Sequence, residues 1–319
     1  KQFNNTSKLR TMNTTTEIFD RIEHYKIQQR SPEWFQLRLG KFTSSNIYKL
    51  FASATKEKRA ESILNLDHTK GKIKLFASAA EINYACKKLD LSEAITKEVK
   101  AEIKTAVKAK FEDMKLNSIS KYVLKFCNCL DNIHTFSEGA ETFILEKAAE
   151  FIFSDKDSIF VNDAMMWGID NEEAAKQEYL KRTGFMGLDV GFIEAGNNTG
   201  SSPDLLVSVG GENIGLAEFK CPNQLNHLKN VINIKTSEDL KKHHLNYWFQ
   251  CQHQIYCSGR TWCDFVSFHP NLLSGPYAGL SLHIVRIPKC EKIQAEFAEI
   301  LPKAAALRDS YIKELLNKI

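Results

Sequence analysis

The sequence lacks long apolar segments: no run approaches the roughly 18 consecutive apolar residues that span a bilayer. Its polar start, KQFNNTSKLRTMNTTT, also lacks the apolar core of a secretory signal peptide. We therefore expect a cytoplasmic protein with no membrane partner. With 319 residues, 43% of them hydrophobic and 26% charged, the chain has the composition of a globular protein that buries a sizeable core.

Several chemical motifs are absent as well. The eight cysteines form no C-x-x-C pair and no regular framework, which is typical of free thiols in a reducing compartment. The chain has no Walker A loop, no H-E-x-x-H motif, no nucleophile elbow and no dinucleotide-binding glycine pattern. Nothing therefore favours a P-loop ATPase, a zinc protease, an α/β-hydrolase or a nicotinamide-dependent enzyme.

Proline and glycine are scarce in the first half of the chain. No proline lies between Pro32 and Pro203, and Gly71 and Gly139 are the only glycines between residues 41 and 167. This composition favours long helices. The expected organisation is a flexible tail over 1–16, the first part of a core over 17–52, a mostly helical insertion over 53–160, and the rest of the core over 161–319, with two C-terminal helices divided by Pro302.

The positive charge is unevenly distributed. The formal net charge is only +4, but residues 53–120 hold 14 basic and 10 acidic residues and so contain the whole excess. This asymmetry indicates a polyanionic partner. Apolar residues recur there at helical spacing, and a second face carries Lys97, Lys100, Lys104 and Lys108. That basic face is either a solvated surface with intrahelical glutamate partners or a contact for DNA.

From Gly184 onward the sequence changes character. Glycines cluster, and short runs with β-branched residues alternate with turn signals, which predicts a sheet. A helix is expected over roughly 236–258, followed by the strand-like runs TWCDFVSFH and SLHIVRI. This order of helices and strands predicts a mixed α/β (α+β) fold with a helical insertion before the sheet.

Two carboxylates are expected to meet in one hairpin of this region. The runs DLLVSV and NIGLAEFK are joined by a glycine turn, and Asp204 and Glu218 lie about equally far from it. Strand alternation places Glu218 and Lys220 on the same face. An ordinary Glu–Lys pair on an exposed sheet is the simpler structural alternative.

The same residues suit metal-assisted phosphodiester hydrolysis. Mg²⁺ is usually held by one or two carboxylates together with phosphate oxygens and water. Asp204 and Glu218 supply the carboxylates, the backbone carbonyl of Phe219 is a candidate third oxygen, and Mn²⁺ can substitute. Lys220 would orient or deprotonate the attacking water.

Four segments carry a family resemblance. Ser202-Pro203-Asp204, thirteen further residues, and Glu218-Phe219-Lys220 resemble the PD-(D/E)XK nuclease signature. The four blocks are WFQLRLGKFTSS from Trp34, MWGIDNE from Met166, EFKCP from Glu218 and QCQHQIY from Gln250. In this order they are similar to blocks of the YqaJ-like, lambda-exonuclease-type viral recombinases.

The resemblance, which covers about residues 30–52 and 160–300, implies a restriction-endonuclease-like core with a central mixed sheet. It also implies Mg²⁺-dependent digestion of double-stranded DNA from its ends, usually of the 5′ strand, for phage-type recombination. The family further suggests a single-strand annealing protein as partner and, in some members, a homotrimeric ring.

The resemblance assigns roles residue by residue. Asp204 and Glu218 match metal ligands, Lys220 matches the lysine that serves the attacking water, and Glu172 matches a glutamate that assists at the metal. The positions around the terminal 5′-phosphate in the family match Arg38, Ser45, Ser202 and Gln252.

Simpler structural roles stand beside these assignments. Arg38 would pair with an acid, Ser45 would cap a helix, and Gln252 would satisfy buried backbone groups. Trp167 is expected to pack in the core. Met165 lies near the point where the family uses an apolar side chain to split the duplex, but a core position is the simpler expectation.

Other functions remain open at this stage. One is a RecB-like or restriction-like endonuclease of the same superfamily, with or without an iron–sulfur cluster. Another, from a different class, is a catalytically inert DNA-binding module. The sequence departs from the family where Leu205 replaces a glycine and where the segment 53–160 is much longer than the link that the family needs; the resemblance does not explain this segment.

Overall fold

The computed structural model describes residues 20–51, 136, 138–154, 163–196 and 198–318, with short strands at 8–9, 66–67 and 72–73. The chain divides into two units, one of residues 1–49 and 142–319 and the other of residues 50–141. Within the second unit, β4 (Leu66–Asp67) pairs antiparallel with β5 (Lys72–Ile73). The predicted basic face at Lys97, Lys100, Lys104 and Lys108 lies outside the described residues. So does the predicted tail over 1–16, apart from β1 (Lys8–Leu9).

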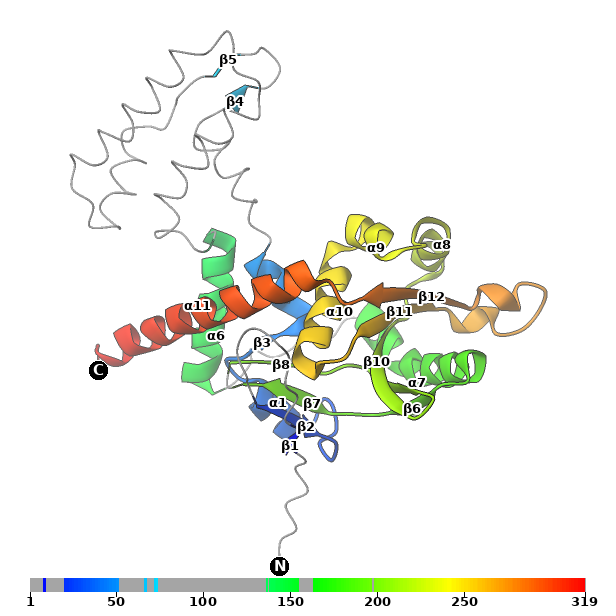
Figure 1. Cartoon of the computed structure of the whole chain (residues 1–319), viewed down its shortest axis with the longest axis horizontal. Coiled ribbons are helices and arrows are strands. Elements are labelled where there is room, and N and C mark those ends of the chain that lie inside the picture. Colours follow the sequence, from blue (N-terminus) through cyan, green and yellow to red (C-terminus); the bar gives the residue numbers. More distant parts are fainter. Residues whose placement is uncertain are drawn as a thin grey trace, which may run out of the picture. The chain divides into compact units, whose positions relative to one another are not determined.

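The first unit contains two five-stranded mixed sheets (Figure 1). The strands of the first sheet, in spatial order, are β1, β2 (Arg21–His24), β7 (Phe192–Ala195), β8 (Thr199–Ser201) and β3 (Phe42–Thr43). The second sheet has the order β12 (Leu282–Pro288), β11 (Trp262–Phe268), β10 (Glu212–Lys220), β9 (Leu205–Val209) and β6 (Met186–Leu188). Strands β10 and β11 run parallel, and the other pairs of the second sheet are antiparallel. The predicted mixed α/β class is therefore confirmed.

The helices are α1 (Pro32–Arg38), α6 (Glu138–Phe153), α7 (Asp163–Thr183), α8 (Gln224–Asn233), α9 (Ser237–His243), α10 (Leu245–Ser258) and α11 (Glu291–Leu316). Short 3-10 turns are η1 (Ser44–Leu50), η2 (Pro270–Leu272) and η3 (Ala278–Leu280). Among these elements, none of the helices combines the length and apolar character needed to cross a bilayer.

Strand alternation gives the second sheet two differently covered faces. On one face, Ala175 and Tyr179 of α7 belong to a buried core with Ala217 and Phe219 of β10. On the other face, Phe265 stacks against Tyr247 of α10 with ring centroids 5.9 Å apart. Glu218 lies between Ala217 and Phe219 on β10, so its side chain points away from α7 and toward α10.

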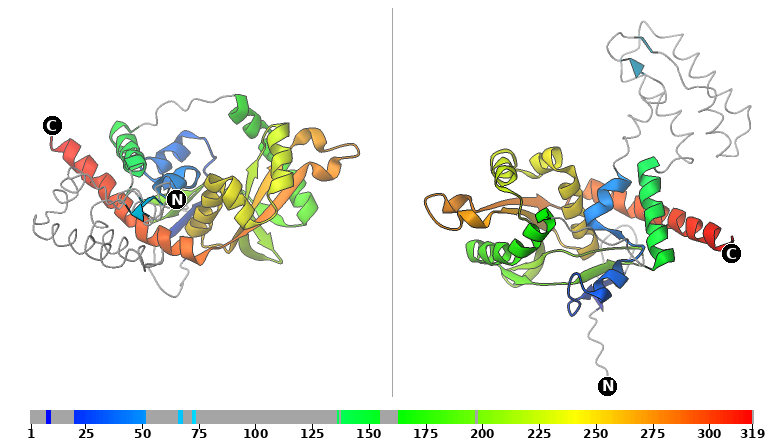
Figure 2. Two further views of the ribbon diagram at one scale, coloured as in Figure 1. Left: turned by 90° about the horizontal axis from the view of Figure 1, so that it is seen from above. Right: turned by 180° about the vertical axis from the view of Figure 1, so that it is seen from behind.

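Helix α10 is the central helix of this unit and packs against both sheets (Figures 1 and 2). It buries nearly its whole length, from Trp248 to Cys257. The buried polar residues of α10 lie on different sides of the helix, and each side contacts a different part of the protein. This location makes α10 the element that reaches the hairpin of β9 and β10.

The predicted helix over 236–258 is in fact two helices. A capping box between Thr236 and Asp239 starts α9, and the chain leaves the helical conformation at His244, with φ −140° and ψ 68°. His244 Nε2 lies 3.0 Å from Asn230 Oδ1 of α8, so a tertiary contact accompanies the break.

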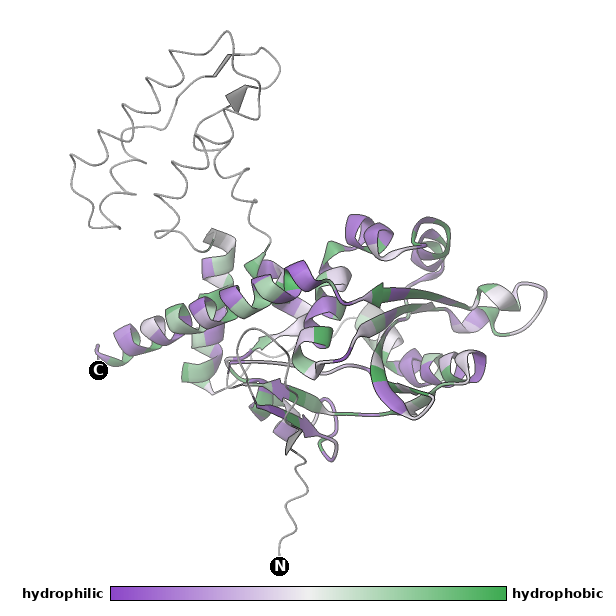
Figure 3. Ribbon diagram, viewed as in Figure 1, coloured by the Kyte–Doolittle hydropathy of each residue, from purple (hydrophilic) through white to green (hydrophobic). Residues whose placement is uncertain are grey.

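The prediction of two C-terminal helices divided by Pro302 is wrong, because α11 continues through that proline. A proline inside a helix removes one backbone hydrogen bond and costs about 3 kcal/mol. Figure 3 shows hydrophilic and hydrophobic residues alternating along α11. Leu301, Ala304 and Ala305 are buried around the proline, and this packing offsets the cost.

Candidate active site

The hairpin of β9 and β10 brings Asp204 and Glu218 together. The turn residues Gly210 and Gly211 both have positive φ, at 60° and 87°, a conformation that glycine adopts readily. Leu206 pairs with Leu216 and Leu205 with Ala217, so the next positions along the ladder are Asp204 and Glu218. The predicted convergence of the two carboxylates is confirmed.

Asp204 is fastened to the neighbouring strand by its side chain. Its Oδ2 accepts a hydrogen bond from the backbone N–H of Phe219 at 2.7 Å. Burial raises the pKa of the Asp204 carboxyl well above its usual range, and the charges of Glu218 and Glu172 raise it further. Three acidic side chains thus repel one another in a poorly solvated space.

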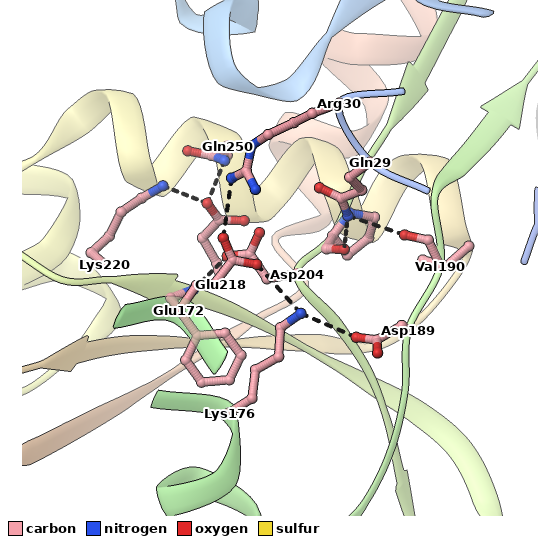
Figure 4. Close-up of polar contacts among 12 residues, drawn as sticks. Gln29, Arg30, Glu172, Lys176, Asp189, Val190, Asp204, Glu218, Lys220 and Gln250 are labelled. Carbon is pink, nitrogen blue, oxygen red and sulfur yellow. Dashed lines mark hydrogen bonds and ion pairs between the residues drawn. The ribbon is translucent and has the colours of Figure 1, made fainter. Parts of the chain in front are cut away.

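The Glu218 carboxylate is buried and has a donor on each oxygen. Lys220 Nζ and Gln250 Nε2 lie 2.5 and 2.6 Å from Oε1 (Figure 4). Gln254 Nε2 lies 2.5 Å from Oε2. Gln250 and Gln254 are one helical turn apart on α10 and therefore present both amides to the same carboxylate. The sequence motifs assigned no role to either glutamine, although their i, i+4 spacing is visible in the sequence.

Lys220 holds its proton in this environment. Burial alone would lower the pKa of Lys220, but the charges of Glu218 and Asp204 outweigh burial and raise it. Its ammonium group also lies 4.9 Å from the centre of the Tyr247 ring.

Glu172 approaches the hairpin from α7 and is held by two cations. Arg30 Nη2 lies 3.2 Å from its Oε2, and Lys176 Nζ lies 3.3 Å from its Oε1 (Figure 4). Arg30 has a positive φ of 71°, a strained conformation for a residue other than glycine. Sequence reasoning missed Arg30 because no motif marks it.

These residues line a pocket of about 740 Å³. Its charged lining consists of Arg30, Glu172, Asp204, Glu218 and Lys220. Three carboxylates therefore face two cations. Burial and the nearby acids, Glu172 foremost among them, raise the pKa of the Cys221 thiol in the lining to about 12, so this thiol is neutral.

Met165 and Trp167 also line the pocket, which corrects the prediction that they are core residues. Their exposed fractions are 44% and 38%. The α7 residues that fill the core, Ala175 and Tyr179, lie farther along the helix. The indole and the thioether are therefore available at the surface of the pocket.

Two of the residues that match the family's phosphate site meet in the structure. Arg38 Nη1 lies 3.3 Å from Ser202 Oγ, and the guanidinium stacks on Trp34 at 3.9 Å from the ring centre. Arg38 is 9% exposed and has no ion-pair partner among the described residues; its Nε has no hydrogen-bond partner there either. Burial lowers the pKa of Arg38 to about 10, so it remains charged at neutral pH.

The other two residues, Ser45 and Gln252, differ in their surroundings. Ser45 is exposed in η1. Gln252 is fully buried, donates to the carbonyl of Pro288 at 2.8 Å and accepts from the backbone N–H of Cys290 at 3.0 Å. The prediction of a phosphate contact for Gln252 is therefore not supported, and its alternative role with buried backbone groups fits instead.

The donor set suits a hard divalent cation. Among the described residues, no group of three or more His, Cys, Asp or Glu side chains is arranged to enclose a metal ion. Mg²⁺ does not need such a group, since one or two carboxylates with water and phosphate oxygens suffice. Asp204 and Glu218 meet this requirement, and their mutual repulsion is what a cation would relieve.

Comparison with known proteins agrees with the motifs. A profile of the YqaJ-like viral recombinase domain matches residues 129–261, which include the hairpin and α10. No curated protein matches the chain. The match confirms the resemblance to YqaJ-like recombinases.

Solved structures of exonucleases are similar to this chain, and that of LHK-Exo shares its fold. An alkaline exonuclease, LHK-Exo from Laribacter hongkongensis, has 21% sequence identity and a TM-score of 0.55, covering 90% of this chain and 97% of its own. LHK-Exo in complex with dAMP gives the same values. A phage-related exonuclease from Haemophilus somnus 129PT has 14% identity and a TM-score of 0.46, over 56% of this chain and 85% of its own. The similarity to LHK-Exo supports the predicted nuclease-type fold class.

Proposed function

We propose that the protein is a Mg²⁺-dependent deoxyribonuclease that digests double-stranded DNA from its ends. The observation that carries this proposal is the convergence of Asp204, Glu218 and Lys220 on one pocket with an excess of carboxylates. An inert relative would be expected to have lost at least one of these groups. The similarity of the fold to an alkaline exonuclease supports the same conclusion.

Asp204 and Glu218 would hold Mg²⁺, with Mn²⁺ as a substitute. The Phe219 carbonyl is a candidate third oxygen. The backbone N–H and C=O of one strand residue point to the same neighbouring strand, and the N–H of Phe219 donates to Asp204, so its carbonyl points toward the Asp204 side as well. When bound, the cation would polarise the phosphate and lower the pKa of a water nucleophile. Glu172 would assist from α7, where Arg30 and Lys176 fix its carboxylate.

Lys220 would act first as a hydrogen-bond donor. Its raised pKa keeps the ammonium group charged, so it can orient water and stabilise negative charge on the phosphate. To act as a base it must release its proton, which becomes easier once the charges of Glu218 and Asp204 are neutralised.

We also propose a polarity of digestion and a biological role. Arg38 and Ser202 would bind a terminal 5′-phosphate, because a buried guanidinium without an ion-pair partner in the described residues suits a bidentate anion. Digestion from the 5′ end would leave 3′ single strands for recombination, with an annealing protein as partner. A homotrimer remains a proposal by family analogy.

The test uses linear duplex DNA with 5′-phosphates, covalently closed circular DNA, and the Lys220→Ala variant. Mg²⁺-dependent loss of one strand of the linear DNA, absent in Lys220→Ala, supports the end-dependent exonuclease and gives its polarity. Cleavage of the circle would indicate the endonuclease alternative. No Lys220-dependent digestion of either DNA would favour the inert binding module.

A further inference from the structure

The pocket has a charged part and an uncharged part. The charges come from Arg30 and from the acids and lysine of the candidate catalytic group. The first turns of α7 and the segment after β11 contribute a different wall, consisting of Met165, Trp167, Gly168, His269 and Asn271, which has no acidic or basic side chain apart from the imidazole. A ligand that fills both parts therefore combines a group that the charged part can hold, such as a phosphate bound together with the proposed Mg²⁺, with a neutral, flat or apolar group.

Trp167 is the dominant surface of the uncharged wall. It is 38% exposed, and its ring centroid lies 5.9 Å from that of His269 at an interplanar angle of 45°. Trp167 and Glu172 belong to the same helix, so the indole is held at a fixed separation from a carboxylate of the charged part. The wall is thus rigidly connected to the candidate catalytic group.

His269 makes a tilted ring contact with the indole and has a polar atom without a hydrogen-bond partner among the described residues. It is 3% exposed, and its Nδ1 has no hydrogen-bond partner in the part of the chain that the structure describes. Burial lowers the pKa of His269, so the ring adds no charge to the wall at neutral pH. A buried ring nitrogen without a partner is costly unless a ligand or water satisfies it.

His269 is itself held in place by a second ring. The His227 ring lies 5.9 Å away. His227 Nδ1 contacts Ser267 Oγ at 3.0 Å and its Nε2 contacts the Leu280 carbonyl at 2.7 Å. The tilted ring contacts from His227 through His269 to Trp167 give the indole an aromatic support, which suits stacking against another flat ring.

We propose that this wall is a nucleobase subsite, in which Trp167 stacks on the base of the nucleotide whose phosphate lies at Asp204, Glu218 and Lys220. The proposal rests on the proposed nuclease function and specifies how its substrate is held. A volume of about 740 Å³ falls within the range of small-ligand sites and accommodates one nucleotide. Asn271 and the amides of α8 that line the pocket, Asn226 and Gln224, can hydrogen-bond to base edges without adding charge.

The experiment compares a ligand that has a base with one that lacks it. Binding of 2′-deoxyadenosine 5′-monophosphate and of 2-deoxyribose 5-phosphate is measured by calorimetry with Mg²⁺ present. The proteins are the wild type, Trp167→Ala, Trp167→Phe and Leu316→Ala. Leu316 is an exposed apolar residue at the end of α11 and serves as the matched control. Thermal unfolding verifies that each variant is folded.

The wild type is expected to bind the nucleotide about fivefold or more tightly than the sugar phosphate, since stacking of a base on an aromatic side chain is worth ~1–3 kcal/mol. Trp167→Ala should bring the two affinities within about twofold, while Trp167→Phe and Leu316→Ala keep the preference. Equal binding of both compounds by the wild type, no binding of the nucleotide, or a preference that survives in Trp167→Ala overturns the subsite.

A failure of the nuclease proposal looks different. DNA digestion is measured on the same preparations and on Lys220→Ala. Absence of Lys220-dependent digestion refutes the proposed function whatever the binding data show. If the wild type digests DNA normally but Trp167→Ala still prefers the nucleotide over the sugar phosphate, only the subsite is refuted.

Discussion

Gln254 donates its side-chain amide to Oε2 of Glu218 across 2.5 Å, and both residues are buried. Gln250, one turn earlier on α10, donates to the other oxygen at 2.6 Å. The carboxylate is therefore oriented by a helix that packs on both sheets, and its position does not depend on its own strand alone. Such supporting contacts orient a ligand group for its metal.

Gln254→Leu should lower DNA digestion about 10- to 100-fold at limiting Mg²⁺, because Oε2 of Glu218 loses its donor. Raising the Mg²⁺ concentration should restore part of the activity. The measurement is a Mg²⁺ titration of the digestion rate. Gln252→Leu is the matched control on the same helix: its amide bonds backbone groups, so it should change thermal stability but not the Mg²⁺ midpoint. Equal midpoints for wild type and Gln254→Leu would contradict this supporting role.

Lys220→Ala should reduce cleavage at least about 100-fold, the scale expected for loss of a group that handles a proton or developing charge. Binding to a DNA end should remain, because other groups supply most phosphate contacts. Single-turnover cleavage and fluorescence anisotropy separate the two effects. Cleavage within tenfold of wild type would exclude a direct role for the lysine.

Arg38→Lys should retain folding and the positive charge but lose the planar guanidinium that contacts Ser202. The ratio of digestion rates on 5′-phosphorylated and 5′-hydroxyl DNA should fall about tenfold. Rates on the 5′-hydroxyl DNA serve as the internal control and should be nearly unchanged. An unaltered ratio would remove Arg38 from the phosphate site.

His253 should make stability depend on pH. Its Nδ1 lies 2.8 Å from Ser44 Oγ and its Nε2 lies 2.9 Å from Thr199 Oγ1. The Thr199 hydroxyl donates to the Phe42 carbonyl at 2.6 Å, so it accepts from Nε2–H of a neutral imidazole. Burial lowers the pKa of His253 to about 3.

In the unfolded chain, His253 therefore takes up a proton near pH 6.5, whereas in the folded chain it takes up that proton only near pH 3. The free energy of unfolding should fall as the pH falls through this window, by about 2 kcal/mol between pH 7 and pH 5 from this residue. Urea unfolding at several pH values measures the slope. His253→Gln keeps a donor and an acceptor and should have a flatter slope; an identical slope would show that His253 does not titrate in this way.

The basic face at Lys97, Lys100, Lys104 and Lys108 is tested by salt dependence. Replacing the four lysines with glutamine should weaken DNA binding and make its dependence on salt shallower if the face contacts phosphates. Binding isotherms at several salt concentrations give the slope. An unchanged slope would identify the face as solvated surface.

The sequence by itself determined the hairpin. Gly210 and Gly211 set a two-residue turn, and strand periodicity places Lys220 on the same face as Glu218. The turn alone would set Asp204 opposite Ala217; a register shift between Glu212 and Gly215, which the sequence did not predict, sets it opposite Glu218. The turn and the strand alternation are local consequences of backbone geometry, so they needed no long-range information. The strands around the hairpin were predictable for the same reason.

Tertiary structure decided which side chains surround the hairpin. Gln250 and Gln254 face Glu218 while Gln252 between them faces the core, because helix rotation and packing choose the side. Arg30 reaches Glu172 across 142 positions of sequence, a contact that no local pattern encodes. Pro302 likewise stays inside α11 because burial of its neighbours outweighs the lost hydrogen bond. Contacts between distant segments depend on the packing of the whole unit, and only the folded chain specifies them.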